Sequence, residues 1–105
     1  MANSGSIDEQ LRFAIGNKRL LRLRYHDALR IVEPHDYGVL NKTEKLFVYQ
    51  RQNLTRPADG REAHWRLLEV SEIGDCTVMD DTFPGSRGGA YSKHLQWEIL
   101  YARVS

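Results

Sequence analysis

Arginine and aromatic side chains are the groups in this sequence best suited to holding a ligand. The chain has eleven arginines and four lysines, and the planar fork of arginine binds phosphate and carboxylate groups in a bidentate manner. Aromatic rings beside a basic groove can stack on nucleic-acid bases. The alternative is that the arginines pair with acidic residues and the rings fill the core. The candidate ligand-binding residues are Arg22, Arg24, Tyr25, Arg30, His35, Tyr37, Tyr49, Arg51, Trp65 and Arg66.

The segment from Arg30 to Gly38 holds the densest group of such side chains. It contains an arginine, a glutamate, a histidine, an aspartate and a tyrosine. Proline cannot donate to a sheet ladder, so Pro34 predicts an edge, a bulge or the end of a strand. Gly38 follows four residues later and is expected to mark the limit of the extended segment. Within it, Arg30 and His35 are the residues we expect to contact a ligand.

A metal site has little support in the sequence. His35 and His64 could be joined by Glu33 or Asp36 around an ion. No His-x-His, His-x-x-x-His or Cys-x-x-Cys spacing accompanies them, however, and structural and catalytic metal sites commonly show such spacings. A histidine that bonds the backbone beside Pro34 is the favoured interpretation, and we predict no metal and no cofactor.

Catalysis is not indicated either. Asp80 and Asp81 are adjacent on an expected strand, so their carboxylates should point to opposite faces instead of working as a pair. The glycines around Arg87 could cradle a phosphate, but they lack the phosphate-loop motif, and a flexible tail is favoured. No nucleophile and base pair is recognisable. We therefore expect a protein that is not an enzyme.

The composition is that of one globular domain. The 105 residues are 41% hydrophobic and 28% charged, which suffices for a single core. A net charge of +1 argues neither for nor against a polyanionic partner. The single cysteine, Cys76, excludes an intramolecular disulfide and suits a reducing compartment. Neither a signal peptide nor an apolar run of about 20 residues is visible, so we expect a cytoplasmic protein without a membrane partner.

The elements expected to position these residues are one helix followed by strands. Ser6 and Glu9 have the spacing of a capping box, which predicts a helix over 7–16 behind a flexible stretch, 1–5. From residue 19 the apolar period changes to two, which is typical of strands, and strands are expected over 19–80. The remainder, 83–105, is interpreted as a Gly-rich tail and a C-terminal strand, with a helix as the alternative for 96–104.

A turn over residues 26–28 would place Arg22, Arg24 and Arg30 on one face of a hairpin. Five or so short strands behind one helix favour a small, strongly bent antiparallel sheet. We predict that this sheet closes into a barrel, because closure removes exposed strand edges.

The order of these motifs resembles the WYL domain family of bacteria, and the tail resembles that of short, free-standing members. The similarity extends from about Leu11 to Tyr101. Its motifs are Arg30-x-Val32-Glu33-Pro34-His35-x-Tyr37-Gly38, Leu46-x-x-Tyr49-Gln50, Trp65-Arg66-Leu67-Leu68-x-Val70-x-x-Ile73 and Phe83-x-Gly85-x-Arg87-x-Gly89-x-Tyr91.

The resemblance implies an Sm-like, SH3-type barrel behind an N-terminal helix, forming one domain over 1–105. In longer members of the family this barrel is fused to a helix-turn-helix and serves transcription regulation as a ligand-sensing module. Single-stranded DNA is the ligand in some members, and small nucleotides have been suspected. No second helical domain is recognisable in this sequence, so promoter recognition by a helix-turn-helix is not expected.

Two functions remain open at this point. The first is a regulatory binding module that holds single-stranded nucleic acid or a small phosphorylated, anionic ligand through arginine and aromatic residues. The second is a protein-interaction or assembly subunit without a ligand of its own, either a homo-oligomer or the partner of a regulatory or defence complex. An unpaired edge strand would serve such assembly, because an exposed edge can pair with another chain.

Overall fold

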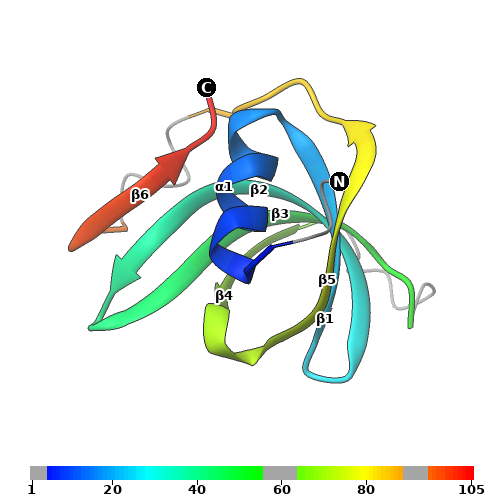
Figure 1. Ribbon diagram of the computed structural model, residues 1–105, viewed down its shortest axis with the longest axis horizontal. Helices are drawn as coiled ribbons and strands as arrows, with labels where there is room; N and C mark the ends of the chain where they lie inside the picture. Colours follow the sequence, from blue (N-terminus) through cyan, green and yellow to red (C-terminus); the bar gives the residue numbers. More distant parts are fainter. Residues whose placement is uncertain (1–4, 56–63, 89–94) are drawn as a thin grey trace.

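The computed structural model describes residues 5–55, 64–88 and 95–105. In these ranges the chain is mainly β, with one α-helix (Figure 1), and no helix is long and apolar enough to cross a membrane. Most of the N-terminal stretch predicted to be flexible, and part of the predicted tail, lie outside the described residues. The elements are α1 (Ile7–Gly16), β1 (Arg19–Tyr25), β2 (Ala28–Leu40), β3 (Thr43–Asn53), β4 (His64–Glu69), the 3₁₀ turn η1 (Val70–Glu72), β5 (Ile73–Thr82) and β6 (Ile99–Arg103).

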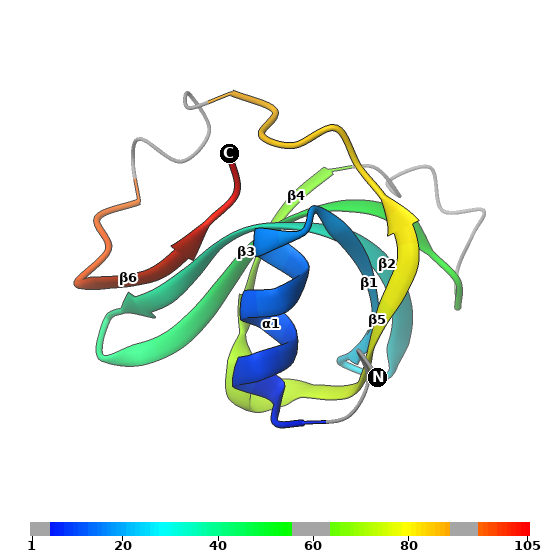
Figure 2. The ribbon, with the colours of Figure 1, turned by 45° about the horizontal axis from the view of Figure 1, so that its top comes forward.

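Helix α1 confirms the predicted bounds and the predicted capping box. The Ser6 hydroxyl accepts the Glu9 backbone N–H at 3.1 Å, and the Glu9 carboxylate accepts the Ser6 backbone N–H at 2.9 Å. The helix lies in the hollow of the curved sheet (Figure 2) and buries its apolar face there. The core that it completes contains Leu11, Ala14, Ile15, Leu21, Leu23, Val32, Leu46, Val48, Leu68 and Val78.

The sheet is antiparallel and strongly curved, but it is not closed. Its hydrogen-bonded order is β4-β3-β2-β1-β5, and β6 is added to β2. Among the described strands, β4 and β5 are the two ends of this path and do not pair with each other; η1 joins them instead. The prediction of a closed barrel is therefore not confirmed. The 3₁₀ turn brings β4 round toward β5 without a ladder between them.

Strand β2 contradicts the prediction that Pro34 and Gly38 limit the extended segment. The strand runs for 13 residues through both of them. On one side it pairs with β1 up to Val32, and with β6 from Asp36 onward. Pro34 falls in the interval between these two partners, where its missing N–H costs no ladder bond on that side. A register shift against β3 follows Pro34, so the proline marks a bulge, one of the outcomes expected for it.

The turn between β1 and β2 is shorter than predicted. Tyr25 pairs with Ala28, so the loop consists of His26 and Asp27 alone. Both have positive φ, 49° and 62°, as a type I′ turn requires, and this turn matches the twist of a hairpin. The expected three-residue turn was wrong by one residue.

That one residue changes the face on which Arg30 lies. Arg30 is paired with Leu23, whose side chain is fully buried, and is itself only 6% exposed. Arg22 and Arg24 alternate with Leu23 along β1 and point to solvent. The prediction that Arg22, Arg24 and Arg30 share one face is therefore wrong, because a slip of one residue moves a side chain to the other side of a sheet.

The C-terminal strand is confirmed as β6, and Gly38 explains how it packs. A Cβ atom on Gly38 would lie 2.1 Å from the carbonyl oxygen of Ile99 and 3.0 Å from the ring of Trp97. Only glycine lets β6 approach β2 so closely. Gly38 therefore serves the docking of a neighbouring strand and does not end its own.

Candidate anion-binding site

A buried carboxylate held by two arginines forms the centre of the candidate site. Glu33, in β2, has a side chain that is 1% exposed. Arg51, from β3, donates Nε–H to its Oε2 at 2.8 Å. Arg87, from the segment that follows β5, donates Nε–H to Oε1 at 2.8 Å and Nη2–H to Oε2 at 2.9 Å. We call these three residues the Glu33 cluster.

The charges of the Glu33 cluster do not cancel. Burial alone would raise the pKa of Glu33, but the hydrogen bonds from Arg87 and Arg51 outweigh it and hold the pKa below 4.5. The same bond raises the pKa of Arg87. Two guanidinium groups and one carboxylate leave one excess positive charge. Because Glu33 is buried while the side chains of Arg51 and Arg87 are 40% and 42% exposed, this excess faces solvent.

Both arginines also keep hydrogen-bond donors that Glu33 does not use. Within the described chain, Arg51 donates only through Nε, so its two Nη groups remain for solvent or a ligand. Arg87 uses Nε and Nη2 and keeps Nη1. A fixed guanidinium with outward N–H groups is the arrangement that binds phosphate and carboxylate oxygens well.

Aromatic side chains from neighbouring strands lie beside the cluster. Glu33 pairs with Tyr49, and Tyr49 pairs with Trp65, so the three form a row across β2, β3 and β4. The guanidinium of Arg87 lies 3.8 Å from the centre of the Tyr49 ring. Trp65 stacks on Phe47 with ring centres 4.9 Å apart and an angle of 6°. These contacts fix the direction of Arg87 and cover part of the ring faces that a base would need.

His35 is buried behind the cluster and supports it. Its Nδ1–H donates to the Glu33 carbonyl oxygen at 2.9 Å, and its Nε2 accepts the backbone N–H of Arg87 at 3.3 Å. This pair of bonds corresponds to the neutral ring. Burial lowers the pKa of His35, against the opposing effect of the bond to Glu33. The ring also meets Trp65 edge-on at 4.8 Å. His35 thus holds the chain at Arg87.

The segment that carries Arg87 is held in place by glycine and by the last strand. Phe83 is buried and stacks on the ring of His35 at 5.7 Å. Gly85 has φ of +120°, and a Cβ there would lie 2.5 Å from the Ser105 carbonyl oxygen. The Ser86 N–H donates to that same oxygen at 3.1 Å. A segment expected to be a flexible tail is therefore attached to the body of the protein as far as Arg87.

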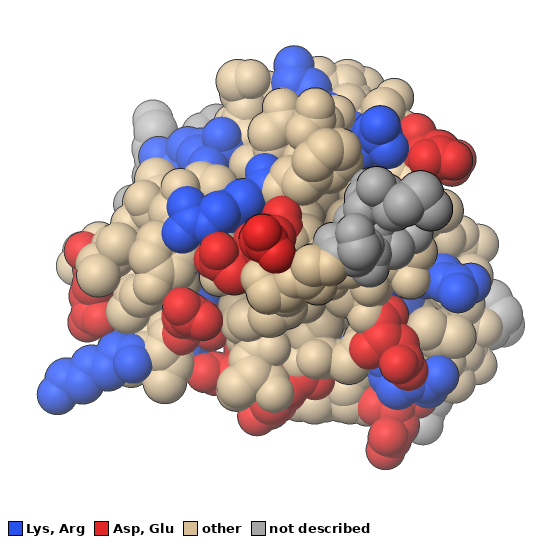
Figure 3. Space-filling model, in the orientation of Figure 1, with Lys and Arg blue, Asp and Glu red and all other residues tan. Residues whose placement is uncertain are grey.

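Four of the predicted ligand-binding residues come together at this place: His35, Tyr49, Arg51 and Trp65. Arg22 and Arg24 lie elsewhere, on the exposed side of β1, and Arg24 forms an ion pair with Asp75 at 3.0 Å. On the side of the molecule drawn in Figure 3, basic and acidic side chains are intermixed. The charges on that side therefore do not mark it as a binding face.

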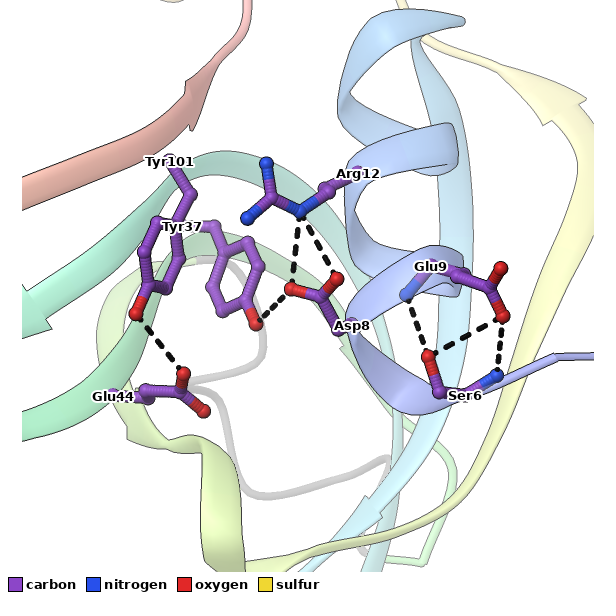
Figure 4. Close-up of polar contacts among 7 residues, drawn as sticks. All are labelled: Ser6, Asp8, Glu9, Arg12, Tyr37, Glu44 and Tyr101. Carbon is purple, nitrogen blue, oxygen red and sulfur yellow. Dashed lines mark hydrogen bonds and ion pairs between the residues drawn. The ribbon is translucent and has the colours of Figure 1, made fainter.

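Tyr25 and Tyr37 belong to the core. Tyr37 is 1% exposed and donates its hydroxyl to Asp8 at 2.7 Å, which joins β2 to α1 (Figure 4). Burial, and then the bond to Asp8, raise the pKa of Tyr37, and the Tyr37 hydrogen bond lowers the pKa of Asp8. Tyr25 is 6% exposed, and its hydroxyl accepts the Glu69 backbone N–H at 2.9 Å. We leave both tyrosines out of the candidate site.

Arg30 and Arg66 lie on the opposite, concave face of the sheet. Arg30 donates to the Tyr25 carbonyl oxygen through Nε at 3.3 Å and Nη2 at 3.1 Å, and to the Gln50 side chain at 2.8 Å. Arg66 donates to Nε2 of His64 at 3.0 Å. None of these hydrogen bonds goes to the Glu33 cluster.

Two members of the cluster, Glu33 and Arg87, are not among the ligand-binding residues predicted from the sequence. The sequence offers Glu33 as a possible metal ligand and Arg87 as part of a Gly-rich tail that could cradle a phosphate, and both stand in the motifs that resemble WYL domains. The usable signal for Arg87 was its place two residues after Gly85, in a segment preceded by the aromatic Phe83. For Glu33 no local signal exists, because a buried glutamate is recognised by its partners, and these come from residues 18 and 54 positions away.

Metal binding finds no support in the described ranges, where no three His, Cys, Asp or Glu side chains come together. What the arrangement can do is attract and orient an anion beside two guanidinium groups. Comparisons with family models, with curated proteins and with solved structures found no match to this chain.

Proposed function

We propose that this protein is a non-enzymatic binding module for an anionic ligand held at the Glu33 cluster. The observation that carries the proposal is the pair of half-exposed guanidinium groups fixed on one buried carboxylate. A fixed donor loses less entropy on binding than a mobile surface arginine. The excess positive charge and the outward N–H groups favour a phosphate or carboxylate.

The ligand class that fits is single-stranded nucleic acid or a small phosphorylated molecule. Phosphate oxygens would bind the Nη groups of Arg51 and Arg87. The exposed parts of the Tyr49 and Trp65 rings border the same place. Since Tyr49 already carries Arg87 on one face and Trp65 already carries Phe47, phosphate contacts should contribute more than base stacking.

The test is to titrate a fluorescent single-stranded oligonucleotide, a mononucleotide and inorganic phosphate at two salt concentrations. We expect binding that weakens with salt, as phosphate contacts require. Arg51→Gln and Arg87→Gln should each weaken it by about tenfold, the loss of one good charged contact. Arg22→Gln, an exposed arginine on β1, is the matched control and should bind as the wild type does.

Loss of folding must be separated from loss of binding, because both arginines hold Glu33. Arg51→Lys keeps the positive charge but removes the planar guanidinium group that can bind in a bidentate manner. This variant should fold and bind with intermediate affinity. Thermal melts of every variant accompany the titrations. If the folded wild type binds none of the three probes in a salt-sensitive manner, the proposal fails.

Assembly through strand edges is the second candidate function. Leu67 in β4 and Ile99 and Leu100 in β6 are exposed large apolar side chains, at 40%, 54% and 40%. β4 ends the hydrogen-bonded path, and β6 pairs with β2 alone in the described part of the chain. Such edges can accept a further strand. Sedimentation over a range of concentrations decides: a monomer throughout argues against self-assembly.

We also propose that the domain is an open form of an Sm-like, SH3-type barrel and that it belongs with the WYL domains as a regulatory module. The support is the helix placed before the strands, the return of β5 to pair with β1, and the motifs around Glu33, Tyr49, Trp65 and Arg87. An experimental structure with the strand path closed or rearranged in another order would contradict this assignment.

A further inference from the structure

The concave face of the sheet changes from apolar to polar along its length. In β3, Leu46 and Val48 face the core, and the next residue on that side is Gln50, which is 1% exposed. In β4, Leu68 faces the core opposite Leu46, and the next residue on that side is Arg66. Side chains two apart on a strand share a face. On the concave face, β3 and β4 therefore carry apolar core residues at one end and the polar residues Gln50 and Arg66 at the other.

A pocket of about 310 Å³ lies at this polar end. Such a volume is at the lower limit of small-molecule sites. The pocket is bordered by the β1–β2 turn, by the end of β3 and by β4. Its lining side chains include His26, Asp27, Arg30, Asn53, Thr55 and Arg66.

Arg66 is a cation in this pocket that has no acidic partner among the described residues. Its hydrogen bond goes to Nε2 of His64, and that acceptor exists only on a neutral imidazole. Across residues 5–55, 64–88 and 95–105, no carboxylate forms an ion pair with Arg66. Arg30 adds a second guanidinium whose position is fixed by the Tyr25 carbonyl oxygen and by Gln50. Among the described residues that line the pocket, Asp27 is the one acidic residue.

Thr55 supplies a neutral donor beside the two arginines. Its Oγ1 accepts the backbone N–H of Leu29 at 2.9 Å, and its own N–H donates to the Asn53 side chain at 3.0 Å. The hydroxyl is thereby held at the pocket wall. Its oxygen accepts from Leu29, so its hydrogen is not used in that bond and can be donated to a ligand. Guanidinium N–H groups and a hydroxyl are the donors that a phosphate group takes in proteins.

We propose that this pocket is a second, separate binding site for a small phosphate-bearing molecule. The two sites face opposite sides of the sheet, because Arg51 alternates with Gln50 along β3 and Trp65 alternates with Arg66 along β4. A small ligand therefore cannot touch both. The pocket volume of about 310 Å³ suits a small molecule, whereas the guanidinium groups of the Glu33 cluster are half-exposed. The inference goes beyond the proposed function and does not depend on it.

The test is NMR titration of the whole protein with inorganic phosphate and with adenosine monophosphate. We expect saturable shifts of the Asn53, Thr55 and Arg66 amide signals. Arg66→Gln should weaken the affinity measured from these signals by about tenfold, the loss of one charge-assisted pair. Arg66→Lys should weaken it less. Arg51→Gln should leave the affinity of this pocket unchanged, although the variant weakens binding at the Glu33 cluster.

The inference would be overturned by no saturable shift at these amides, by an affinity of Arg66→Gln equal to that of the wild type, or by an equal loss of affinity in Arg51→Gln. Acetate at matched ionic strength is the control for the chemistry of the ligand, and shifts equal to those with phosphate would refute a phosphate site. Arg66 belongs to this pocket and Arg51 to the Glu33 cluster, so each variant tests one site. If one site binds no ligand, the affinity of the other can still be measured.

Discussion

Glu33 is the residue on which the candidate site depends for its geometry. Glu33→Gln keeps the shape and removes the charge that holds two arginines, so we expect a loss of about 2–3 kcal/mol in the free energy of unfolding. Chemical denaturation at pH 7 measures it. Glu9→Gln, at the exposed capping box, is the control and should cost less.

The same variant has a pH dependence of known sign. The pKa of Glu33 is held below its ordinary 4.5 in the folded protein, so its contribution is complete above pH 4.5 and is lost as pH falls through the folded value. The difference in unfolding free energy between wild type and Glu33→Gln should therefore be largest above pH 5 and shrink in acid. A difference that grows in acid would contradict the assignment.

Tyr37 gives a second residue-level prediction. Tyr37→Phe removes a buried hydroxyl that donates to a carboxylate, and we expect a loss of about 1.5 kcal/mol in the free energy of unfolding. The pKa of Asp8, lowered chiefly by this hydroxyl, should rise toward 3.8, as followed by NMR titration. Tyr101→Phe removes the bond to the exposed Glu44 and is the control. An unchanged Asp8 pKa in Tyr37→Phe would refute the role of this bond.

At this scale the sequence predicts residue types better than their partners. It singled out His35, Tyr49, Arg51 and Trp65, which meet in space, because arginine and aromatic residues in strands are recognisable from composition. It placed Arg30 with Arg22 and Arg24, which is wrong, because the face of every residue after a turn depends on whether that turn has two residues or three. No local pattern separates these lengths at His26 and Asp27, since neither residue is glycine.

Among the elements, β6 depends most on a single position. Gly38→Ala would place a Cβ 2.1 Å from the Ile99 carbonyl oxygen, so β6 must move away, at a cost of about 2–3 kcal/mol. Thermal melting gives the loss, and hydrogen exchange of the β6 amides should show selective deprotection. Gly16→Ala, at a helix position with nothing within 4 Å, is the control and should stabilise the protein slightly. Equal exchange in both variants would contradict this account.

Elements were predicted well where one local rule decides them. The capping box fixed the start of α1, and alternation located the strands. The extent of β2 was missed because proline and glycine were interpreted through their own backbone preferences. Both are tolerated here for reasons that lie in other strands: Pro34 falls between β1 and β6, and Gly38 makes room for β6.

For the whole molecule, Cys76 offers a probe of global unfolding. Burial raises the pKa of its thiol to about 11 from 9.0, which leaves roughly a hundredfold less thiolate near pH 8. We expect slow alkylation of the folded protein and a rise in rate that follows the urea unfolding curve. Rapid labelling in the absence of urea would show that β5 opens locally.

Closure of the sheet was beyond prediction from the sequence. The number of strands and their antiparallel order follow from short alternating segments. Whether β5 pairs with β4 depends on the path of the chain between them, and here η1, only three residues long, carries it round a corner. A closed barrel was expected because strand edges need protection. That need does not specify whether a ladder between strands or a turn protects the edge.

The exchange of partners along β2 also sets how the molecule should respond to force. The β1 and β3 ladders share the first part of β2, whereas only β6 joins the chain near Ser105 to the body of the sheet in the described residues. A pull on Ser105 would first load the Ser86 to Ser105 bond, the Val104 to His35 bond and the Arg103 to Asp36 pair. The antiparallel β6 bonds would then break one after another, as in a zipper. The last strand would detach at low tension while the hairpins stay intact, and Arg87, attached through Ser86 to Ser105, would feel that release.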